Sequence, residues 1–211
     1  AYTRGRAIMP HLIPVFQRQY PNVEITLLEG SNDAIQKALL SGGIDLAIAA
    51  YPKAPPSIEL ADYYTEHTVL CLVDSLLVQC QIDLDVRRNE IAAGDLHSLR
   101  DCPFVLGSAA DIGGRIGREL LRASGISPIS KATSENVETL LALCVQGVGA
   151  CFCPENLLQT ALSPEQLAQL HILPLCPSAS YPICFGYLRR SYPWSVLSEF
   201  IRIAREQIRS A

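Results

Sequence analysis

The residues of this chain that could do chemistry are small polar groups placed where helices are expected to begin. Thr3 and Arg4 precede a helical pattern at residues 6–20, and Ser31 and Asn32 precede a second one. Such residues often cap a helix, whose first N–H groups and positive dipole end attract anions. Each Ser or Asn alone is more often an ordinary cap or turn residue. Their repeated placement predicts a site for a small anionic molecule.

The same arrangement recurs in the second half of the chain, around a helix expected at residues 115–123. Its candidate residues are Ser108, Ala109, Gly114 and Arg115. An arginine guanidinium can hold a carboxylate through two parallel hydrogen bonds. Arg4 and Arg6 lie about 200° apart around a helix, so we expect at most one of them to face a ligand. Replacement of Thr3 or Ser31 by alanine is expected to weaken binding and to leave the fold intact.

Motifs that would carry catalysis are missing from the sequence. It has no Gly-x-Ser-x-Gly nucleophile turn, no Gly-x4-Gly-Lys phosphate loop and no His-Glu-x2-His zinc motif. The Gly-Gly-Arg-Ile-Gly run at residues 113–117 has the wrong spacing for a dinucleotide fingerprint and is interpreted as a turn before a helix. We therefore expect no enzyme activity, no catalytic residue and no cofactor.

The chain contains eight cysteines, most of them within apolar stretches that predict buried strands or helices. Cysteine in such places behaves as a small hydrophobe, which favours structural thiols in a reducing cytosol. A thiol-based redox sensor and adventitious metal binding stay open as alternatives. The four histidines are far apart in the sequence, so we expect no built metal site. Cys151 and Cys153 share one face of an expected strand, but such neighbours seldom form an unstrained disulfide.

The composition is that of an ordinary globular protein of 211 residues, with 49% hydrophobic residues, 18% charged residues and a net charge of −4. The 17 basic residues are scattered, whereas contacts to nucleic-acid phosphates need clustered lysine and arginine. Basic residues between 189 and 209 are interpreted as a solvated helix face. No apolar run reaches the ~20 residues that span a bilayer, and no leader is visible. We therefore expect a cytoplasmic protein that makes no membrane contact.

Hydrophobic periodicity predicts that strands and helices alternate along both halves of the chain. The expected elements are a helix at 6–20, a strand at 23–28, a helix around 35–40, strands at 45–49, 68–73 and 103–107, a helix at 115–123, a strand at 129–132, a helix at 137–146, strands at 148–153 and 183–188, and a helix at 194–208. The expected buried stripe of the last helix is Val196, Leu197, Phe200, Ile201, Ala204 and Ile208. This order predicts an α/β fold with mostly parallel sheets and helices on both faces.

Two signatures resemble those of a known family. In the first, the helix carries Met9-Pro10 and ends at Tyr20-Pro21, and it is followed by Glu29-Gly30-Ser31 and by Gly-Gly-Ile-Asp-Leu-Ala-Ile at residues 42–48. In the second, at residues 134–154, a helix runs into Gly-Val-Gly and a strand that ends in proline. These motifs resemble the effector-binding region of LysR-type transcriptional regulators. The resemblance covers nearly the whole chain except residues 74–90, which lack the His-Pro-Leu often found there.

The resemblance implies a fold like that of type II periplasmic binding proteins, with two Rossmann-like lobes joined by two crossover strands. Lobe I would comprise residues 1–72 and 187–211, and lobe II residues 73–186. Thr3 and Ser31 occupy positions at which the family commonly contacts its effector. The implied protein is a bacterial regulator in which a small effector, bound between the lobes, controls DNA binding and transcription. DNA would be bound only through an N-terminal winged helix-turn-helix domain absent from this chain.

The alternative function is that of a solute-binding receptor of a transporter with the same fold. Such a receptor would need an export leader and would seldom keep eight cysteines in an oxidising compartment.

The resemblance also implies a homodimer or homotetramer in which the first helix of one copy lies against the second lobe of another. The helix at 6–20 agrees with this because its apolar residues occupy more than one face. The helix at 137–146 is the expected partner surface. Alternatively, Pro10 and Pro14 kink the first helix so that both apolar stripes are buried within one chain.

Overall fold

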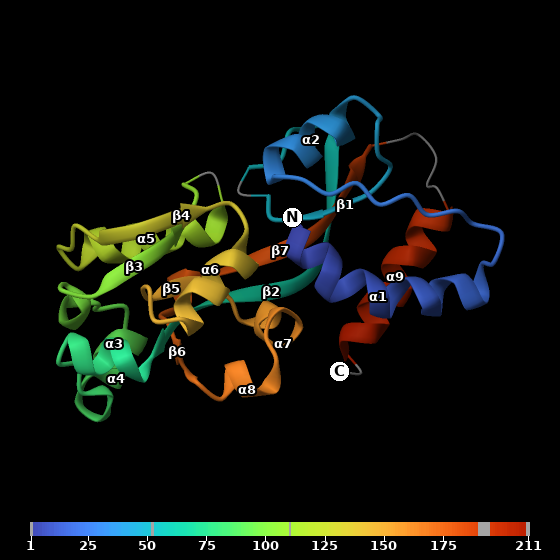
Figure 1. Cartoon of the computed structure of the whole chain (residues 1–211). Helices are drawn as coiled ribbons and strands as arrows, with labels where there is room; N and C mark the ends of the chain where they lie inside the picture. The colour runs from blue at the N-terminus through green and yellow to red at the C-terminus, as the bar shows by residue number, and fades with distance from the viewer. Residues whose placement is uncertain (1, 52, 110, 190–194, 210–211) are drawn as a thin grey trace. The chain divides into compact units, whose positions relative to one another are not determined.

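The computed structural model describes residues 2–51, 53–109, 111–189 and 195–209, and it forms two compact units (Figure 1). Unit 1 consists of Ala1–Thr65 and Pro182–Ala211, and unit 2 is Glu66–Tyr181. Two strands contribute to both units, β2 (Ile58–Val73) and β7 (Ser180–Leu188). The lobe boundaries expected from the sequence, 72/73 and 186/187, lie within the same two strands.

Unit 1 contains the helices near both ends of the chain. Its elements are α1 (Tyr2–Gln19), α2 (Asn32–Leu40), β1 (Ala47–Ala49), α9 (Ser195–Arg209) and parts of β2 and β7. β1 pairs antiparallel with β7. α1 packs on α9, where the rings of Phe16 and Phe200 lie 5.1 Å apart and the Tyr20 hydroxyl donates to Glu199 Oε2 at 3.0 Å. The buried core of the unit contains Leu12, Phe16, Phe185, Ile201, Ile203 and Ala204.

Unit 2 contains a parallel pair of strands and an antiparallel group around β2. Its helices are α3 (Asp74–Gln79), α4 (Leu84–Ala92), α5 (Ile112–Ala123), α6 (Val137–Val145), α7 (Leu158–Ala161) and α8 (Pro164–Leu167). Its own strands are β3 (Pro103–Gly107), β4 (Ile129–Ser134), β5 (Cys151–Pro154) and β6 (Leu170–Pro174). Short 3-10 turns lie at His97–Leu99, Glu155–Leu157 and Pro177–Ala179. Phe104 of β3 and Phe152 of β5 stack in the core, with ring centroids 6.0 Å apart.

Two helices begin earlier than the sequence pattern predicted. Thr3 and Arg4 lie inside α1 and not in a loop before it. Gly114 and Arg115 lie in the first turn of α5, after the N-cap residue Asp111. The apolar stripe marks only the buried face of a helix, and its first turn is often polar, so periodicity places the start too late.

The last helix also differs from the expected pattern. Ile208 was expected in the buried stripe, but it is 40% exposed. Ile203 was not expected there and is 1% exposed. Ile208 lies in the last turn of α9, where the described part of the core no longer covers the helix.

The strand expected at residues 23–28 is not formed. In the described part of the chain, residues 23–30 make one backbone hydrogen bond outside regular elements, from Val23 N–H to Tyr20 O at 3.1 Å. An alternating pattern indicates which side chains share a face, but a strand forms only beside a partner.

The expectation of mostly parallel sheets is also wrong for the described residues. β3 and β4 are parallel, as expected, but β1 with β7, β2 with β5 and β2 with β6 are antiparallel. Strand direction depends on which segments meet in space, and the long strands β2 and β7 supply partners that the local pattern cannot specify.

Most of the cysteines are buried, and all eight are free thiols. Burial raises the pKa of Cys102 and of Cys184, which keeps both as neutral thiols of low reactivity. Cys71 Sγ of β2 lies 3.7 Å from Cys153 Sγ of β5, so this pair is a closer candidate for oxidation than two neighbours on β5. The described residues contain no group of three or more His, Cys, Asp or Glu arranged to hold a metal ion.

Among the described helices, none is both long and apolar enough to span a membrane.

Candidate functional site

The start of α2 carries the pair Ser31 and Asn32. Ser31 is the N-cap residue, and its Oγ accepts a hydrogen bond from Ala34 N–H at 3.2 Å. Asn32 follows as the first residue of the helix, and its Oδ1 is buried without a hydrogen-bond partner among the described residues. A carboxamide can present either its oxygen or its NH2 group to a ligand. Asn32 is therefore the member of the pair with unused hydrogen-bonding capacity.

The first turn of α1 lies beside the segment that leads to Ser31. A Cβ at Gly5 would meet the carboxylate of Glu29, so the two segments are in contact. Arg4 is 7% exposed and lines a cavity inside unit 1, whereas Arg6 is exposed. The two arginines thus differ in environment, as their angular separation on a helix requires. The Thr3 side chain lies outside the described part of the structure.

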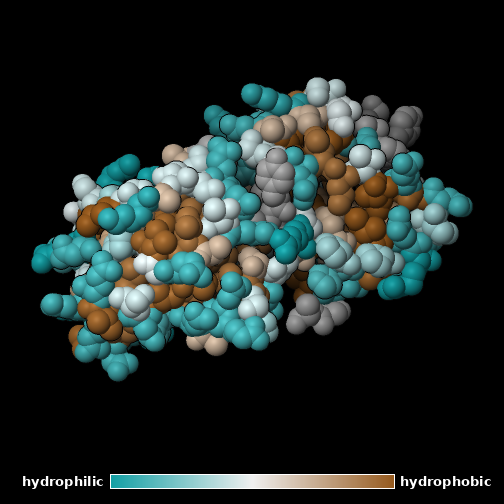
Figure 2. Space-filling view, in the orientation of Figure 1, coloured by the Kyte–Doolittle hydropathy of each residue, from teal (hydrophilic) through white to brown (hydrophobic). Residues whose placement is uncertain are grey.

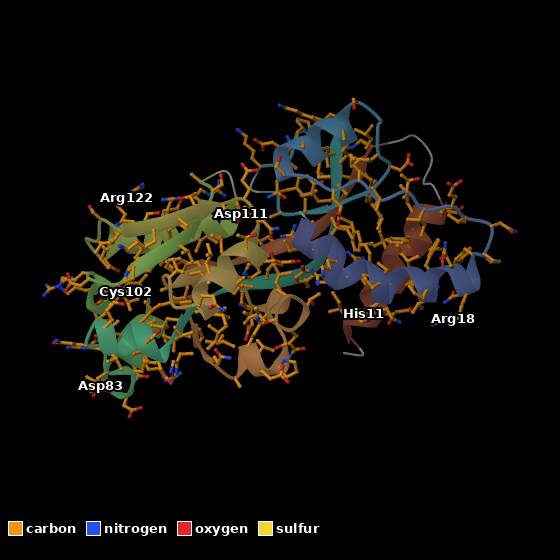
Figure 3. The ribbon with its side chains drawn as sticks, in the orientation of Figure 1. His11, Arg18, Asp83, Cys102, Asp111 and Arg122 are labelled. Carbon is orange, nitrogen blue, oxygen red and sulfur yellow. The ribbon has the colours of Figure 1, made fainter. Side chains whose placement is uncertain are left out.

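The start of α5 is already capped by a carboxylate. Asp111, labelled in Figure 3 at this end of α5, accepts a hydrogen bond from Gly114 N–H through Oδ2 at 3.1 Å. This bond occupies one of the N–H groups that an anion would use, and the negative charge opposes a second anion. Gly114 has a steric role, because a Cβ there would overlap the carbonyl oxygen of Ser108. Arg115 is exposed and approaches Glu119 at 4.0 Å.

Two neighbouring parallel strands bring the remaining residues of unit 2 together. Ser108 follows β3, and its N–H donates to the carbonyl oxygen of Ser134, at the end of β4, at 3.2 Å. Asn136 caps α6 through Oδ1, which accepts from Glu138 N–H at 2.9 Å, and its own N–H donates to Ser134 Oγ at 3.1 Å. The starts of α5 and α6 therefore lie at one edge of this sheet. Ala109 is exposed in the same loop.

Ser134 and Asn136 were missed as site residues, although the sequence held a signal for them. They stand just before the helical pattern at 137–146, as Ser31 and Asn32 stand before α2. The same reasoning about caps would have selected them.

Two further polar groups could not have been found from local pattern. Thr68 of β2 is 2% exposed, and its Oγ1 has no hydrogen-bond partner in the described structure. In unit 1, the Tyr51 hydroxyl oxygen is also buried without a hydrogen-bond partner in the described structure. Burial raises the pKa of Tyr51 to about 12. Buried polar atoms normally have partners, so each is a candidate for ligand or water contact. Thr68 and Tyr51 belong to different units.

These features define a class of protein: an α/β domain of two units that share two strands and carry capped helix starts. The sequence agrees with this class. Residues 2–209 match the LysR substrate binding domain family, and the chain therefore belongs to that family. The predictions of the family and of a fold like that of type II periplasmic binding proteins are confirmed. The family is non-enzymatic, which confirms the prediction that this chain is not an enzyme.

Similar proteins support the same assignment. The chain is 23% identical over 215 residues to the HTH-type transcriptional regulator YcgK of Bacillus subtilis, covering 97% of this chain and 64% of that protein. The chain thus spans less than two thirds of that relative's length. The effector-binding domain of QuiR in complex with shikimate has a TM-score of 0.74 at 17% identity and covers 99% of this chain and 94% of its own. The BenM effector-binding domain with benzoate has a TM-score of 0.74 at 19% identity, covering 96% of this chain and 86% of that one.

Proposed function

We propose that this chain is the effector-sensing domain of a bacterial LysR-type transcriptional regulator and that its effector is a small carboxylate. The observation that carries the proposal is the set of polar groups at the starts of α2 and α6, where Asn32 and Asn136 each stand at a helix N-terminus. Helix N-termini favour anions. Shikimate and benzoate, the ligands of two structural relatives, both carry a carboxylate.

The proposed contacts keep part of the set chosen from the sequence. In the proposal, Thr3, Ser31 and Asn32 contact the effector from lobe I, and Ser108 and Ala109 contact it from lobe II, together with Asn136 at the start of α6. The capped start of α5 makes Gly114 and Arg115 weaker candidates, because Asp111 already holds the Gly114 N–H. Arg4 would contribute its charge from inside unit 1. Effector binding would change lobe closure and, through it, DNA binding by a separate winged helix-turn-helix domain in the cytoplasm.

Ser31→Ala is expected to weaken effector binding strongly. A hydrogen bond to a charged ligand is worth about 1.5–3 kcal/mol, which corresponds to roughly a 10- to 150-fold rise in Kd. The same change also removes the α2 cap and should lower the free energy of unfolding by about 0.5–2 kcal/mol. Thermal-shift screening with a panel of small carboxylates that includes shikimate and benzoate would find a ligand, and calorimetry would then measure Kd.

Ser163→Ala is the matched control for this experiment. Ser163 is also an N-cap serine, at α8, where it forms a capping box with Gln166. Its loss should cost a similar cap energy and leave Kd unchanged. An unchanged Kd for Ser31→Ala would contradict the proposed site.

We further propose that the domain forms a homodimer or homotetramer through α1 and α6. Four large apolar residues of α1 are only partly buried in unit 1: Ile8, Met9, Ile13 and Val15. Sedimentation of the 211-residue chain at micromolar concentration is expected to show a dimer. Ile13→Glu should shift the species toward monomer, because a charge placed in an apolar contact is costly. A chain that stays monomeric at all concentrations, with and without effector, would exclude this assembly.

A further inference from the structure

Arg118 of α5 is a half-buried cation that the contacts named above do not use. Its Nη2 donates a hydrogen bond to the carbonyl oxygen of Gly107, the last residue of β3, at 3.0 Å. Its Nε is buried and has no hydrogen-bond partner in the described structure. A guanidinium carries several N–H donors, so the bond to Gly107 leaves donors of Arg118 without an acceptor among the described residues. Because buried polar atoms normally have partners, these donors indicate a missing acceptor.

The charge of Arg118 also differs in its surroundings from that of other arginines in unit 2. Arg87 of α4 pairs with Glu90 at 2.9 Å, and Arg115 of α5 approaches Glu119 at 4.0 Å, all four side chains being exposed. Arg118 is less exposed and forms no ion pair with a carboxylate in the described part of the chain. A charge that is partly removed from water without an opposite charge beside it is costly. A bound anion would remove that cost.

Glycines hold α5 close to β3 and thereby determine where the Arg118 side chain lies. A Cβ at Gly114 would overlap the carbonyl oxygen of Ser108, and a Cβ at Gly107 would come within 3.1 Å of Gly114 Cα. Arg118 stands four residues after Gly114, on the same face of the helix. Helical side chains point back toward the N-terminus of their helix. The guanidinium therefore lies near the start of α5 and the end of β3, as its bond to Gly107 requires.

The edge of the sheet at which α5 and α6 begin carries further polar groups, those of Ser108, Ser134 and Asn136. Arg118 adds a positive charge to this edge. Asp111 lies at the same edge, but its carboxylate accepts a hydrogen bond from the first turn of α5 and forms no ion pair with Arg118 in the described structure. Guanidinium, hydroxyl and amide donors together are the groups with which proteins bind carboxylates and phosphates.

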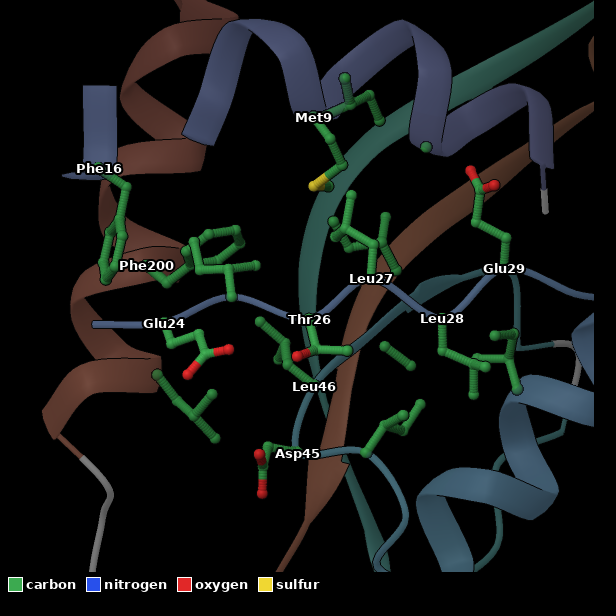
Figure 4. A pocket seen from close by; sticks show the side chains of 18 of the residues that line it. Met9, Phe16, Glu24, Thr26, Leu27, Leu28, Glu29, Asp45, Leu46 and Phe200 are labelled. Carbon is green, nitrogen blue, oxygen red and sulfur yellow. The ribbon is translucent and has the colours of Figure 1, made fainter. Parts of the chain in front are cut away.

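A cavity of about 520 Å³ inside unit 1 is less suited to an anion. Its walls contain Arg4 but also three carboxylates, those of Glu24, Glu29 and Asp45 (Figure 4). Most of the remaining lining is apolar, and Figure 2 shows hydrophobic residues open to the surface on the part of unit 1 near α1 and α9. Carboxylates repel an anion and offset the charge of the arginine beside them. The charge of Arg118 is not offset by such a contact.

We propose that Arg118 binds the carboxylate of the effector and so makes unit 2 selective for an anionic ligand. The inference rests on the proposed function and names the cation that the site lacked. An arginine can hold a planar carboxylate through two parallel hydrogen bonds, and its charge is lost at no accessible pH. Serine and asparagine, by contrast, bind neutral molecules equally well. A neutral effector would leave the donors of Arg118 without an acceptor.

NMR of the arginine side chains tests the inference in the 211-residue chain without any substitution. The Nε–H signal of Arg118 is followed while sodium acetate, benzoate or shikimate is added at constant ionic strength. We expect the signal to shift and to saturate with at least one of these carboxylates. Arg122, exposed in the last turn of α5 (Figure 3), is the internal reference, and its signal should not move. An Arg118 signal that none of the carboxylates moves would overturn the inference.

Two matched variants then measure the effect on affinity. Arg118→Gln and Arg122→Gln each remove one positive charge from α5, the first at the proposed contact and the second at an exposed position. Calorimetry uses the carboxylate that raises the Tm of the parent chain most. Arg118→Gln should raise Kd by roughly 10- to 150-fold, as expected for a hydrogen bond to a charged ligand. Arg122→Gln should change Kd by less than about twofold, because salt screens an exposed charge.

The same measurements separate a failure of this inference from a failure of the proposed function. If a carboxylate stabilises the parent chain and Arg118→Gln equally, the effector class stands, but Arg118 only holds α5 to β3 and the inference is wrong. If none of the carboxylates raises the Tm of the parent chain or moves the Arg118 signal, the proposed effector class is wrong as well.

Discussion

Phe104→Ala is expected to destabilise unit 2 by about 3–5 kcal/mol, the range typical of a fully buried phenylalanine. Phe104 of β3 is 0% exposed and stacks on Phe152. Its backbone also lies against Gly149, where a Cβ would come within 2.9 Å of Phe104 Cα. The surroundings are thus held closely and cannot collapse around the space left by the ring. Transfer and cavity costs therefore add.

Denaturant unfolding followed by circular dichroism measures this effect, with hydrogen exchange assigning it to unit 2. Val86→Ala is the control, because Val86 is 60% exposed on α4 and its truncation should change stability by less than about 0.5 kcal/mol. A loss below about 1.5 kcal/mol for Phe104→Ala would mean that the β3–β5 core is looser than its stacking indicates.

Gly114→Ala should be the second most damaging substitution, with a loss of about 1–3 kcal/mol in the free energy of unfolding. In an ordinary helical position, alanine is more favourable than glycine by up to about 1 kcal/mol. Here a Cβ would overlap the carbonyl oxygen of Ser108 and come within 2.8 Å of the carbonyl carbon of Gly107. These are backbone atoms at the end of β3, so relief requires moving the loop. The sign of the usual helix preference is therefore reversed.

Gly113→Ala is the matched control, one residue earlier in the same turn of α5. Its Cβ would meet only the Asp111 carboxylate, at 3.2 Å, and a side chain can shift by a few tenths of an ångström. We expect a change within about 0.5 kcal/mol of the parent protein. Urea unfolding of both variants decides the point: similar stabilities would show that the loop yields without strain. Gly114→Ala should also alter any ligand contact made by Ser108.

Local chemistry along the chain predicted a large part of this fold. The helices α2, α5 and α6 follow from apolar periodicity, and the cap of α2 follows from Ser31, whereas the caps Asp111 and Asn136 were not among the expected residues. The apolar run Pro-Phe-Val-Leu-Gly predicted β3, and its parallel neighbour β4 followed from the helix between them. Such features depend on residues within a few positions of one another, so they can be found in one sequence.

Only the tertiary structure decided which of the candidate groups still have unused hydrogen-bonding capacity. Arg4 was a candidate on a loop, but an earlier helix start places it inside unit 1. The Gly114 N–H was expected to be free at a helix start, but it donates a hydrogen bond to Asp111 Oδ2. Thr68 stood in an ordinary strand pattern, and only burial left its hydroxyl without a partner in the described structure.

The direction and pairing of strands were also beyond the sequence pattern. Residues 23–28 have the alternation of a strand, yet they remain unpaired among the described residues, while β2 gains two antiparallel neighbours from distant parts of the chain. A helix closes its hydrogen bonds within its own segment, so its sequence can specify it. A strand forms its hydrogen bonds with another segment, which can lie a hundred residues away in the sequence. The hydrogen bonding of a buried polar group depends on all the groups packed around it. For that reason α1, α2, α5, α6 and α9 could be predicted from the sequence. The pairing of the strands and the hydrogen bonding of the candidate binding groups depend on contacts between elements.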